Sequence, residues 1–225
     1  LAEFEEATGA IAAYRSEIVG RLRLAAPNSI ASLLAPTLAA LGQQHPRLEI
    51  DASFSDRLVD LVAERFDVAI RVGPLADSTM VARRIAPVRS VVVASPDYVA
   101  RHGRPQVPQD LVHHSCLIYA SQSAVSWRFR VGNRWTQIPV SGRFRSDSGE
   151  TLVAWAEAGL GIVEGPDILL SEKLAEGRLV RLLEDFPTAE YGMYAIRPSG
   201  AHPPARVRVL VDALMERFGA CRETF

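Results

Sequence analysis

Patterns typical of strands and helices alternate over residues 21–72, and this alternation restricts the fold more than any other feature of the sequence. Apolar residues occupy every second position of LEIDASF at residues 48–54, which is the period of a strand. The next segment, SDRLVDLVAERF at residues 55–66, has apolar residues three and four positions apart, which is the period of a helix. The whole run consists of strands at 21–26, 48–54 and 67–72 and helices at 27–46 and 55–66. This order predicts a parallel or mixed sheet covered by helices.

The starts of the two helices carry polar residues that suit helix ends. Asn28 or Ser29 is the expected N-cap of the first helix, because either side chain can accept a hydrogen bond from a free backbone N–H. Pro36 lies inside this helix and is expected to kink it or to reset its start. Asp56 falls in the first turn of the second helix, where negative charge is favourable.

The rest of the chain is richer in strands and ends in a clear helix. A Gly132–Asn133 turn joins the strands expected at 127–131 and 135–140, and a helix that begins at Ser148 ends at Gly159. Further strands are expected at 90–95, 116–120, 160–164, 178–183 and 191–196, and further helices at 166–177 and 207–218. We therefore expect two α/β lobes. The final helix folds back onto the first lobe, and the chain crosses between the lobes twice, near 92–96 and 192–197.

Charge and cysteine content restrict the function. The chain has 25 basic and 26 acidic side chains, and its net charge of −1 argues against a domain that binds nucleic acid by itself. Cys116 and Cys221 show no disulfide or zinc spacing, and no apolar run is long enough to span a membrane. These features favour a reducing, cytoplasmic compartment. Residues 3–19 predict a helix with one apolar stripe, and the initial Leu1 indicates a piece of a longer protein.

Several blocks of the sequence resemble the effector-binding domain of LysR-type transcriptional regulators. The most specific blocks are DLVAERFDVAIRVGPL at residues 60–75 and DYVARHGRP at residues 97–105, and AGLGIVEGPDIL at residues 158–169 follows in order. The matching blocks together span nearly the whole chain. The resemblance implies an α/β, two-lobed, periplasmic-binding-protein-like (type II) fold with two hinge crossings.

The resemblance also implies a domain organisation and a set of partners. Residues 1–19 correspond to the end of a linker helix, residues 20–93 and 197–225 to regulatory subdomain I, and residues 94–196 to subdomain II. The implied partners are a small-molecule effector in the inter-lobe cleft and a second copy of the chain. A homodimer is expected, with a homotetramer as the alternative for the full-length protein. DNA would be bound only by an N-terminal winged helix-turn-helix that this sequence lacks, and no membrane partner is expected.

Two motifs suggest chemistry that the surrounding residues do not support. His113, His114 and Cys116 could bind a metal or form a nucleophile pair, but adjacent histidines in an extended chain point in different directions, and no orienting carboxylate is evident. We expect Cys116 to open a buried strand as a small apolar residue. GLGIVEG at residues 159–165 has a helix before its glycines, whereas a dinucleotide loop requires a strand there. No metal, cofactor or catalytic residue is therefore expected.

The expected effector residues lie at two helix starts that face one cleft. Asn28 and Ser29 begin the helix of the first lobe, and Asp147 and Ser148 begin a helix of the second lobe. Free backbone N–H groups and the helix dipole favour an anion at such positions. The resemblance implies that the effector lies between the lobes at these loops. Capping of the helices alone is the alternative.

Strand residues complete the expected site. Ser53 and Ser55 flank the end of the second strand, and Arg71 lies in a mostly apolar strand where its permanent charge must meet a ligand or an acid. An ion pair of Arg71 with Asp56, Asp60 or Asp67 is the alternative to a ligand contact.

The sequence departs from the family pattern near residue 163. Val163, Glu164, Gly165 and Pro166 stand where the family often has ALLP, so Glu164 is an acid where an apolar residue is common, and Asp147 stands where the family often has Asn. Two added carboxylates in the cleft would repel an anion and favour a cationic or hydroxylated effector. The alternative is that Glu164 pairs with Arg71 or Arg128.

Three functions are compatible with this fold. The ligand-sensing and oligomerisation domain of a LysR-type regulator is the leading hypothesis, and it controls transcription by shifting the balance between lobe or dimer arrangements. A solute-binding receptor of a transport system is the alternative, since it shares the fold. An enzyme is disfavoured because no nucleophile, base and oxyanion set is present.

Overall fold

The computed structural model describes residues 18–57, 59–74, 79–120, 126–200 and 202–219. Cys221 and most of the helix expected over residues 3–19 lie outside these ranges. Within them, no helix is both long and apolar enough to cross a membrane.

The first lobe is built on a parallel three-stranded core. Strand β1 (Gly20–Ala26) lies between β2 (Leu48–Phe54) and β3 (Val68–Gly73) and is parallel to both. A short 3₁₀ turn, η1 (Asn28–Ile30), leads from β1 into helix α2 (Ala31–Gln44). This arrangement confirms the expected sheet and places the carboxyl ends of the parallel strands at one edge of the lobe.

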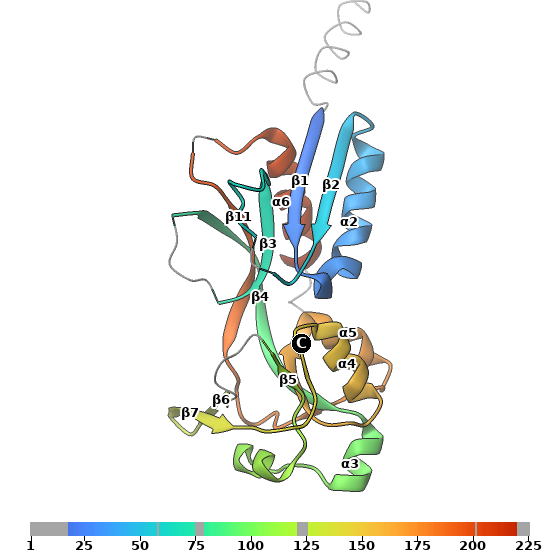
Figure 1. Cartoon of the computed structure of the whole chain (residues 1–225), viewed down its shortest axis with the longest axis vertical. Coiled ribbons are helices and arrows are strands. Elements are labelled where there is room, and N and C mark those ends of the chain that lie inside the picture. The colour runs from blue at the N-terminus through green and yellow to red at the C-terminus, as the bar shows by residue number, and fades with distance from the viewer. Residues whose placement is uncertain (1–17, 58, 75–78, 121–125, 201, 220–225) are drawn as a thin grey trace, which may run out of the picture.

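Two long antiparallel strands run from the first lobe into the second. Strand β4 (Val81–Ala94) pairs with β11 (Glu190–Arg197) in its first half, and with β9 (Val163–Pro166) and β10 (Val180–Leu182) in its second half. Figure 1 shows β4 and β11 descending together between the lobes. The final helix α6 (Ala205–Gly219) returns to the first lobe, as expected.

The second lobe consists of short strands and helices around the lower half of β4. Its β6–β7 hairpin has the expected two-residue turn, because Val131 pairs directly with Arg134. Besides β9 and β10, its elements are α3 (Pro96–His102), η2 (Pro108–His113), β5 (Ile118–Tyr119), β6 (Ser126–Val131), β7 (Arg134–Pro139), β8 (Arg145–Ser146), α4 (Gly149–Glu157) and α5 (Asp167–Ala175).

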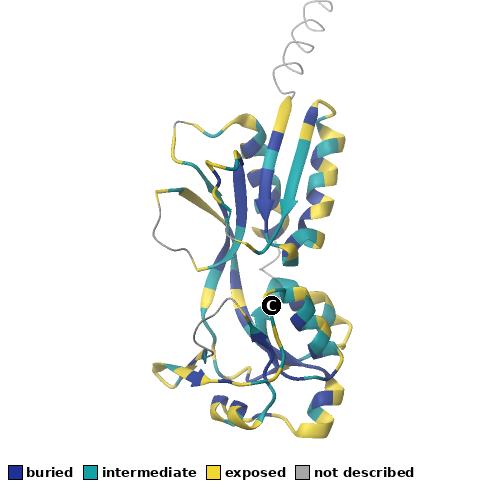
Figure 2. Cartoon of the chain, in the orientation of Figure 1, coloured by how far each residue is buried: buried dark blue, intermediate teal, exposed yellow. Residues whose placement is uncertain are grey.

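Separate apolar cores hold the two ends of β4. Val88 belongs to the core of the first lobe, together with Ile70 and with Leu210 of α6. Val92, only four residues further, belongs to a second core with Phe129 of the hairpin. Figure 2 shows buried residues concentrated on the strands in both lobes. The short stretch of β4 between the two cores therefore connects the lobes.

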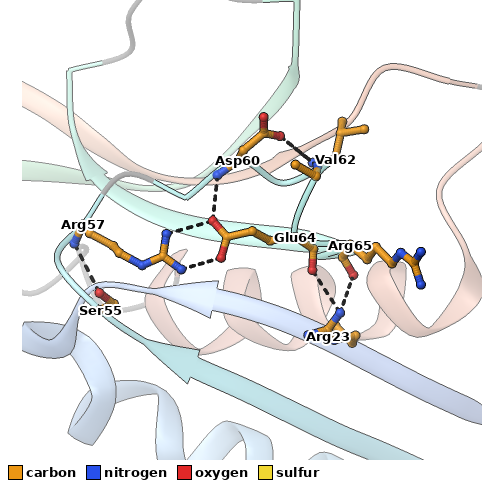
Figure 3. A network of polar contacts seen from close by, with 8 residues as sticks. Arg23, Ser55, Arg57, Asp60, Val62, Glu64 and Arg65 are labelled. Atoms are coloured by element: carbon orange, nitrogen blue, oxygen red, sulfur yellow. Dashed lines mark hydrogen bonds and ion pairs between the residues drawn. The ribbon is translucent and has the colours of Figure 1, made fainter.

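The prediction of a helix over residues 55–66 is wrong, because the described residues of this segment form bends and turns. The Asp60 carboxylate accepts the Val62 N–H at 3.0 Å, and the Glu64 carboxylate accepts the Asp60 N–H at 3.2 Å (Figure 3). Arg65 has a φ of 58°, which is incompatible with a right-handed helix. The Glu64 N–H still donates to Asp60 O at 2.9 Å, so the backbone winds a single turn here, and side chains bind the N–H groups at its start.

Four details of the helices and strands also differ from expectation. Neither Asn28 nor Ser29 caps α2 through its side chain, and the helix runs through Pro36 without a new start. Strand β4 begins at Val81 rather than near Ser90. The sequence pattern did not indicate its first half because several charged residues interrupt the apolar run there. Helix α3 was not predicted, although Pro96 at its first turn is a typical start signal.

Candidate functional site

The first-lobe candidates gather where β1 and β2 end. The Asn28 N–H donates to Asp56 Oδ1 at 3.1 Å, so a carboxylate of the chain itself occupies the start of η1. Ser55 follows β2 directly, and its N–H donates to the carbonyl that ends β1 at 2.9 Å. Ser53 is paired within the β1–β2 register. Ser29 is partly exposed and lies on the side of η1 that faces the second lobe.

Arg71 lies near this group, on strand β3. Its side chain is half-buried, and among the described residues it forms no hydrogen bond and no ion pair within 4.0 Å. Burial lowers the pKa of the guanidinium, and the charge of the Asp56 carboxylate opposes that shift. Asp67, which was one expected partner, is bound to Arg206 at 2.7 Å instead. Arg71 therefore keeps hydrogen-bonding capacity that the described protein does not use.

The start of α4 meets the start of η1 across the two lobes. A Cβ atom built on Gly149 would lie 3.5 Å from the Cβ of Ser29. Ser148 Oγ accepts the Thr151 N–H at 3.3 Å, which confirms its expected role as the N-cap of α4. Asp147 is exposed beside it. The structure thus brings Ser29 and Ser148 to the same interface between the lobes.

Glu164 has a partner that the sequence did not indicate. Its Oε1 accepts a hydrogen bond from Ser90 Oγ at 2.6 Å, and Tyr191 also interacts with Ser90. The three residues come from β9, β4 and β11, at the stretch between the two cores. The expected pairing of Glu164 with Arg71 or Arg128 is not seen among the described residues, so that alternative was wrong.

Burial controls the ionisation of this cluster. It raises the pKa of the Glu164 carboxyl, and the Ser90 hydrogen bond only partly offsets the shift. Burial also raises the pKa of Tyr191 to about 12, with the nearby Glu164 charge acting in the same direction. A raised pKa means that burial favours the neutral form of this carboxyl relative to an exposed one. The sequence offered one signal for Ser90, which is the polar residue directly before the apolar run VVVA at residues 91–94.

Glu164→Gln is expected to make stability less dependent on pH. A carboxyl whose pKa is raised in the folded state contributes stability below its unfolded pKa, and this contribution is lost as pH rises through the folded pKa. The melting temperature of the variant minus that of the wild type should therefore be higher at about pH 8 than at about pH 5. Thermal unfolding across that interval measures the difference, with Glu49→Gln on the exposed surface of β2 as the control. A difference that does not change with pH would contradict the assignment.

Val163 and the histidine segment contribute little to the site. Val163 is 2% exposed and packs in the second-lobe core, so a ligand could reach only its backbone. Cys116 is buried, and its backbone forms an isolated parallel β-bridge with Ile162. Burial raises the pKa of its thiol to about 12. His114 contacts the hydroxyl of Tyr98 at 3.3 Å. Searching the described residues reveals no group of three or more potential metal ligands.

Comparison with known proteins gives a consistent result. A family model described as the LysR substrate binding domain matches residues 15–219. An uncharacterized HTH-type transcriptional regulator of Haemophilus influenzae is 32% identical over 209 residues, which are 92% of this chain and 73% of the relative.

Solved structures of regulators share the fold. The regulatory domain of CrgA, a LysR-type regulator from Neisseria meningitidis, is 31% identical with a TM-score of 0.80, and the match covers 90% of this chain and all of that one. Full-length AphB, a virulence activator of Vibrio cholerae, is 28% identical with a TM-score of 0.76 over 96% of this chain and 75% of AphB.

Proposed function

The chain belongs to the LysR substrate-binding domain family, and we propose that it senses a small anionic effector held between its two lobes. The observation that carries this proposal is the half-buried Arg71 guanidinium, which forms no hydrogen bond with the described residues around it. A guanidinium cannot shed its charge at physiological pH, and it binds carboxylates through two parallel hydrogen bonds. A carboxylate effector would supply the missing partner.

Polar groups from both lobes would complete the effector site. Ser29 and the start of α4 lie together at the interface, where a ligand could contact Asn28, Ser53, Ser55 and Ser148 as well, with the Asp147 carboxylate beside it as a repulsive charge. Because burial raises the pKa of Glu164, this residue can donate a hydrogen bond to an anion when protonated. The departure from the family pattern at Glu164 therefore remains compatible with an acidic effector.

Effector binding would act through the lobes on transcription. A ligand that contacts both lobes favours the arrangement in which its contacts are made, and it can shift the equilibrium only by its difference in affinity between the two states. We propose subdomains at residues 20–93 with 197–225 and at residues 94–196, with β4 and β11 as the crossings. The name of the Haemophilus influenzae relative supports a helix-turn-helix as the DNA-binding part of the full-length protein.

Self-association is part of the proposed function. LysR regulators form oligomers, and the exposed side of α2 carries the small residues Ala35, Ala39 and Ala40, which suit close helix contact. Val62, in the turn segment that follows β2, is 62% exposed and could also contribute an apolar contact to this face. A homodimer through this face is therefore proposed.

The transport-receptor alternative is not favoured, because the Haemophilus influenzae relative and CrgA are named as regulators. Since the family is one of regulators, we also propose that the chain has no catalytic activity.

A thermal-shift screen tests the proposed effector class. The panel contains small carboxylates, phenols, amines and polyols, and a saturating ligand at about 100 times its dissociation constant adds about 2.7 kcal/mol of stability. A carboxylate is expected to raise the melting temperature, and Ser29→Ala should reduce the shift. Asp147→Ala should retain or enlarge it, because this variant removes a negative charge. Shifts produced only by amines or polyols would contradict the proposal.

A further inference from the structure

A groove lies at the hinge, and it meets the candidate effector residues only through Ser90, which lines the groove and donates to Glu164. It is a groove of about 660 Å³, lined by β4, the end of β10, the connection from β10 to β11 and the β6–β7 hairpin. Its volume falls within the range of small-molecule pockets. Figure 1 shows the hairpin beside the lower part of β4, where Phe129 of the hairpin packs in one core with Val92.

The groove exists because the chain leaves the sheet between β10 and β11. Both strands pair antiparallel with β4, β10 at its end and β11 at its first half, and the residues that connect them bulge outward. Leu183 starts the departure with a φ of 55°, a conformation that costs a leucine free energy. The bulge is tied to the hairpin, because the Arg130 N–H donates to Pro187 O at 2.7 Å. The groove is therefore formed before any ligand arrives.

The acidic groups of the groove already have partners. Glu190 is paired with Arg89 at 3.7 Å, and Glu184 is paired with Arg104 at the same distance. Asp167 Oδ1 accepts the Arg89 N–H at 3.2 Å. The two ion pairs offset the charges of Glu190 and Glu184, whereas the hydrogen bond to Asp167 comes from an uncharged backbone group.

Two arginines of the groove are left for a ligand. The side chains of Arg130 on β6 and Arg181 on β10 form no hydrogen bond or ion pair with any residue that the structure describes. They project from different walls of the groove, one from the hairpin and one from the sheet. A ligand with two negative groups can engage both, since each guanidinium can bind one carboxylate in a bidentate manner.

Aromatic side chains in the lining of the groove indicate which ligand scaffold would fit there. Trp135 is 46% exposed and stands opposite Arg130 in the β6–β7 register. Phe186 lines the same groove from the bulge. The Arg128 guanidinium lies over one face of the Trp135 ring, 5.0 Å from its centroid, so a flat, apolar ring that carries acidic substituents would pack on the other face.

We propose that this groove is a second ligand site, which binds an aromatic dicarboxylate between Arg130 and Arg181 with its ring against Trp135. Arg89 and Glu190, at the crossing of β4 and β11 between the lobes, form part of its lining. Occupancy would therefore act on the same hinge as an effector in the cleft, but from another surface.

Calorimetric titration with naphthalene-2,6-dicarboxylate tests this site. Saturable binding to the wild type is expected, and the double variant Arg130→Gln/Arg181→Gln should weaken it by about tenfold or more. Arg134→Gln is the matched control, because Arg134 lies on the same hairpin but does not line the groove. Arg71→Gln should leave the affinity unchanged. Equal melting temperatures of the variants establish that they are folded.

Three outcomes would overturn the second site. The wild type could fail to bind the probe at concentrations up to about 10 mM, or the double variant could bind with wild-type affinity. A loss of binding in Arg71→Gln would place the probe in the cleft instead. This last result would leave the proposed effector site standing, whereas a failure of the thermal-shift screen would leave the groove untouched.

Discussion

Replacing Gly142 by alanine is expected to destabilise the chain by about 3 kcal/mol or more. A Cβ atom at this position would lie 1.8 Å from the carbonyl oxygen of Cys116 and 2.8 Å from its carbonyl carbon. Both atoms belong to the backbone of a fully buried residue, whose N–H also donates to Ser141 O at 2.9 Å. Neither chain segment can yield without breaking this contact. The loss is a large share of the stability typical of a domain.

Urea denaturation measures this effect against a matched glycine. Gly42 lies inside α2, and a Cβ atom at this position would have no other atom within 4 Å, so Gly42→Ala should raise stability by about 0.5–1 kcal/mol. The two alanine variants are therefore expected to shift the unfolding midpoint in opposite directions. A midpoint for Gly142→Ala that equals the wild-type value would show that the two segments are not in contact in solution.

Arg71→Gln is expected to weaken the binding of a carboxylate effector by about 10- to 100-fold. The estimate follows from the loss of a hydrogen bond to a charged group, which contributes about 1.5–3 kcal/mol. Glutamine keeps polar hydrogen-bonding capacity but removes the positive charge and the forked geometry of the guanidinium. Titration calorimetry with the best carboxylate from the thermal-shift screen gives both dissociation constants.

Arg134→Gln provides the control for the loss of one positive charge. Arg134 is exposed on β7 of the second lobe, and the same substitution there should leave the affinity within about twofold of the wild type. Equal weakening in both variants would mean that net charge, rather than a contact from Arg71, governs affinity. Unchanged affinity in Arg71→Gln would remove this residue from the effector site.

The sequence predicted the parts of the fold that depend on local pattern. The parallel strands, the Gly132–Asn133 turn and the final helix each carry a periodicity or a turn signal within a few residues. The segment 55–66 has the same helical periodicity, and yet its described residues form only turns, because Arg65 adopts a φ of 58° that ends the turn begun at Asp60. Periodicity alone could not reveal this backbone reversal.

The candidate site was predictable only in part, for a related reason. Ser148 and the unusual position of Arg71 were evident from residue type and order. The contact of Glu164 with Ser90 depends on the register of β9 against β4, which joins residues 74 positions apart. The occupation of the η1 start by Asp56 likewise depends on how β1 and β2 end side by side. Such long-range pairing leaves no local signal.

The central claim is that the effector binds between the lobes, and mapping of amide chemical shifts by NMR tests it most directly. The isotopically labelled chain is titrated with the best carboxylate from the screen. The largest perturbations are expected at Ser29, Arg71 and Ser148, which belong to both lobes and to three separate elements. Perturbations confined to one lobe, or to residues away from this interface, would contradict the account.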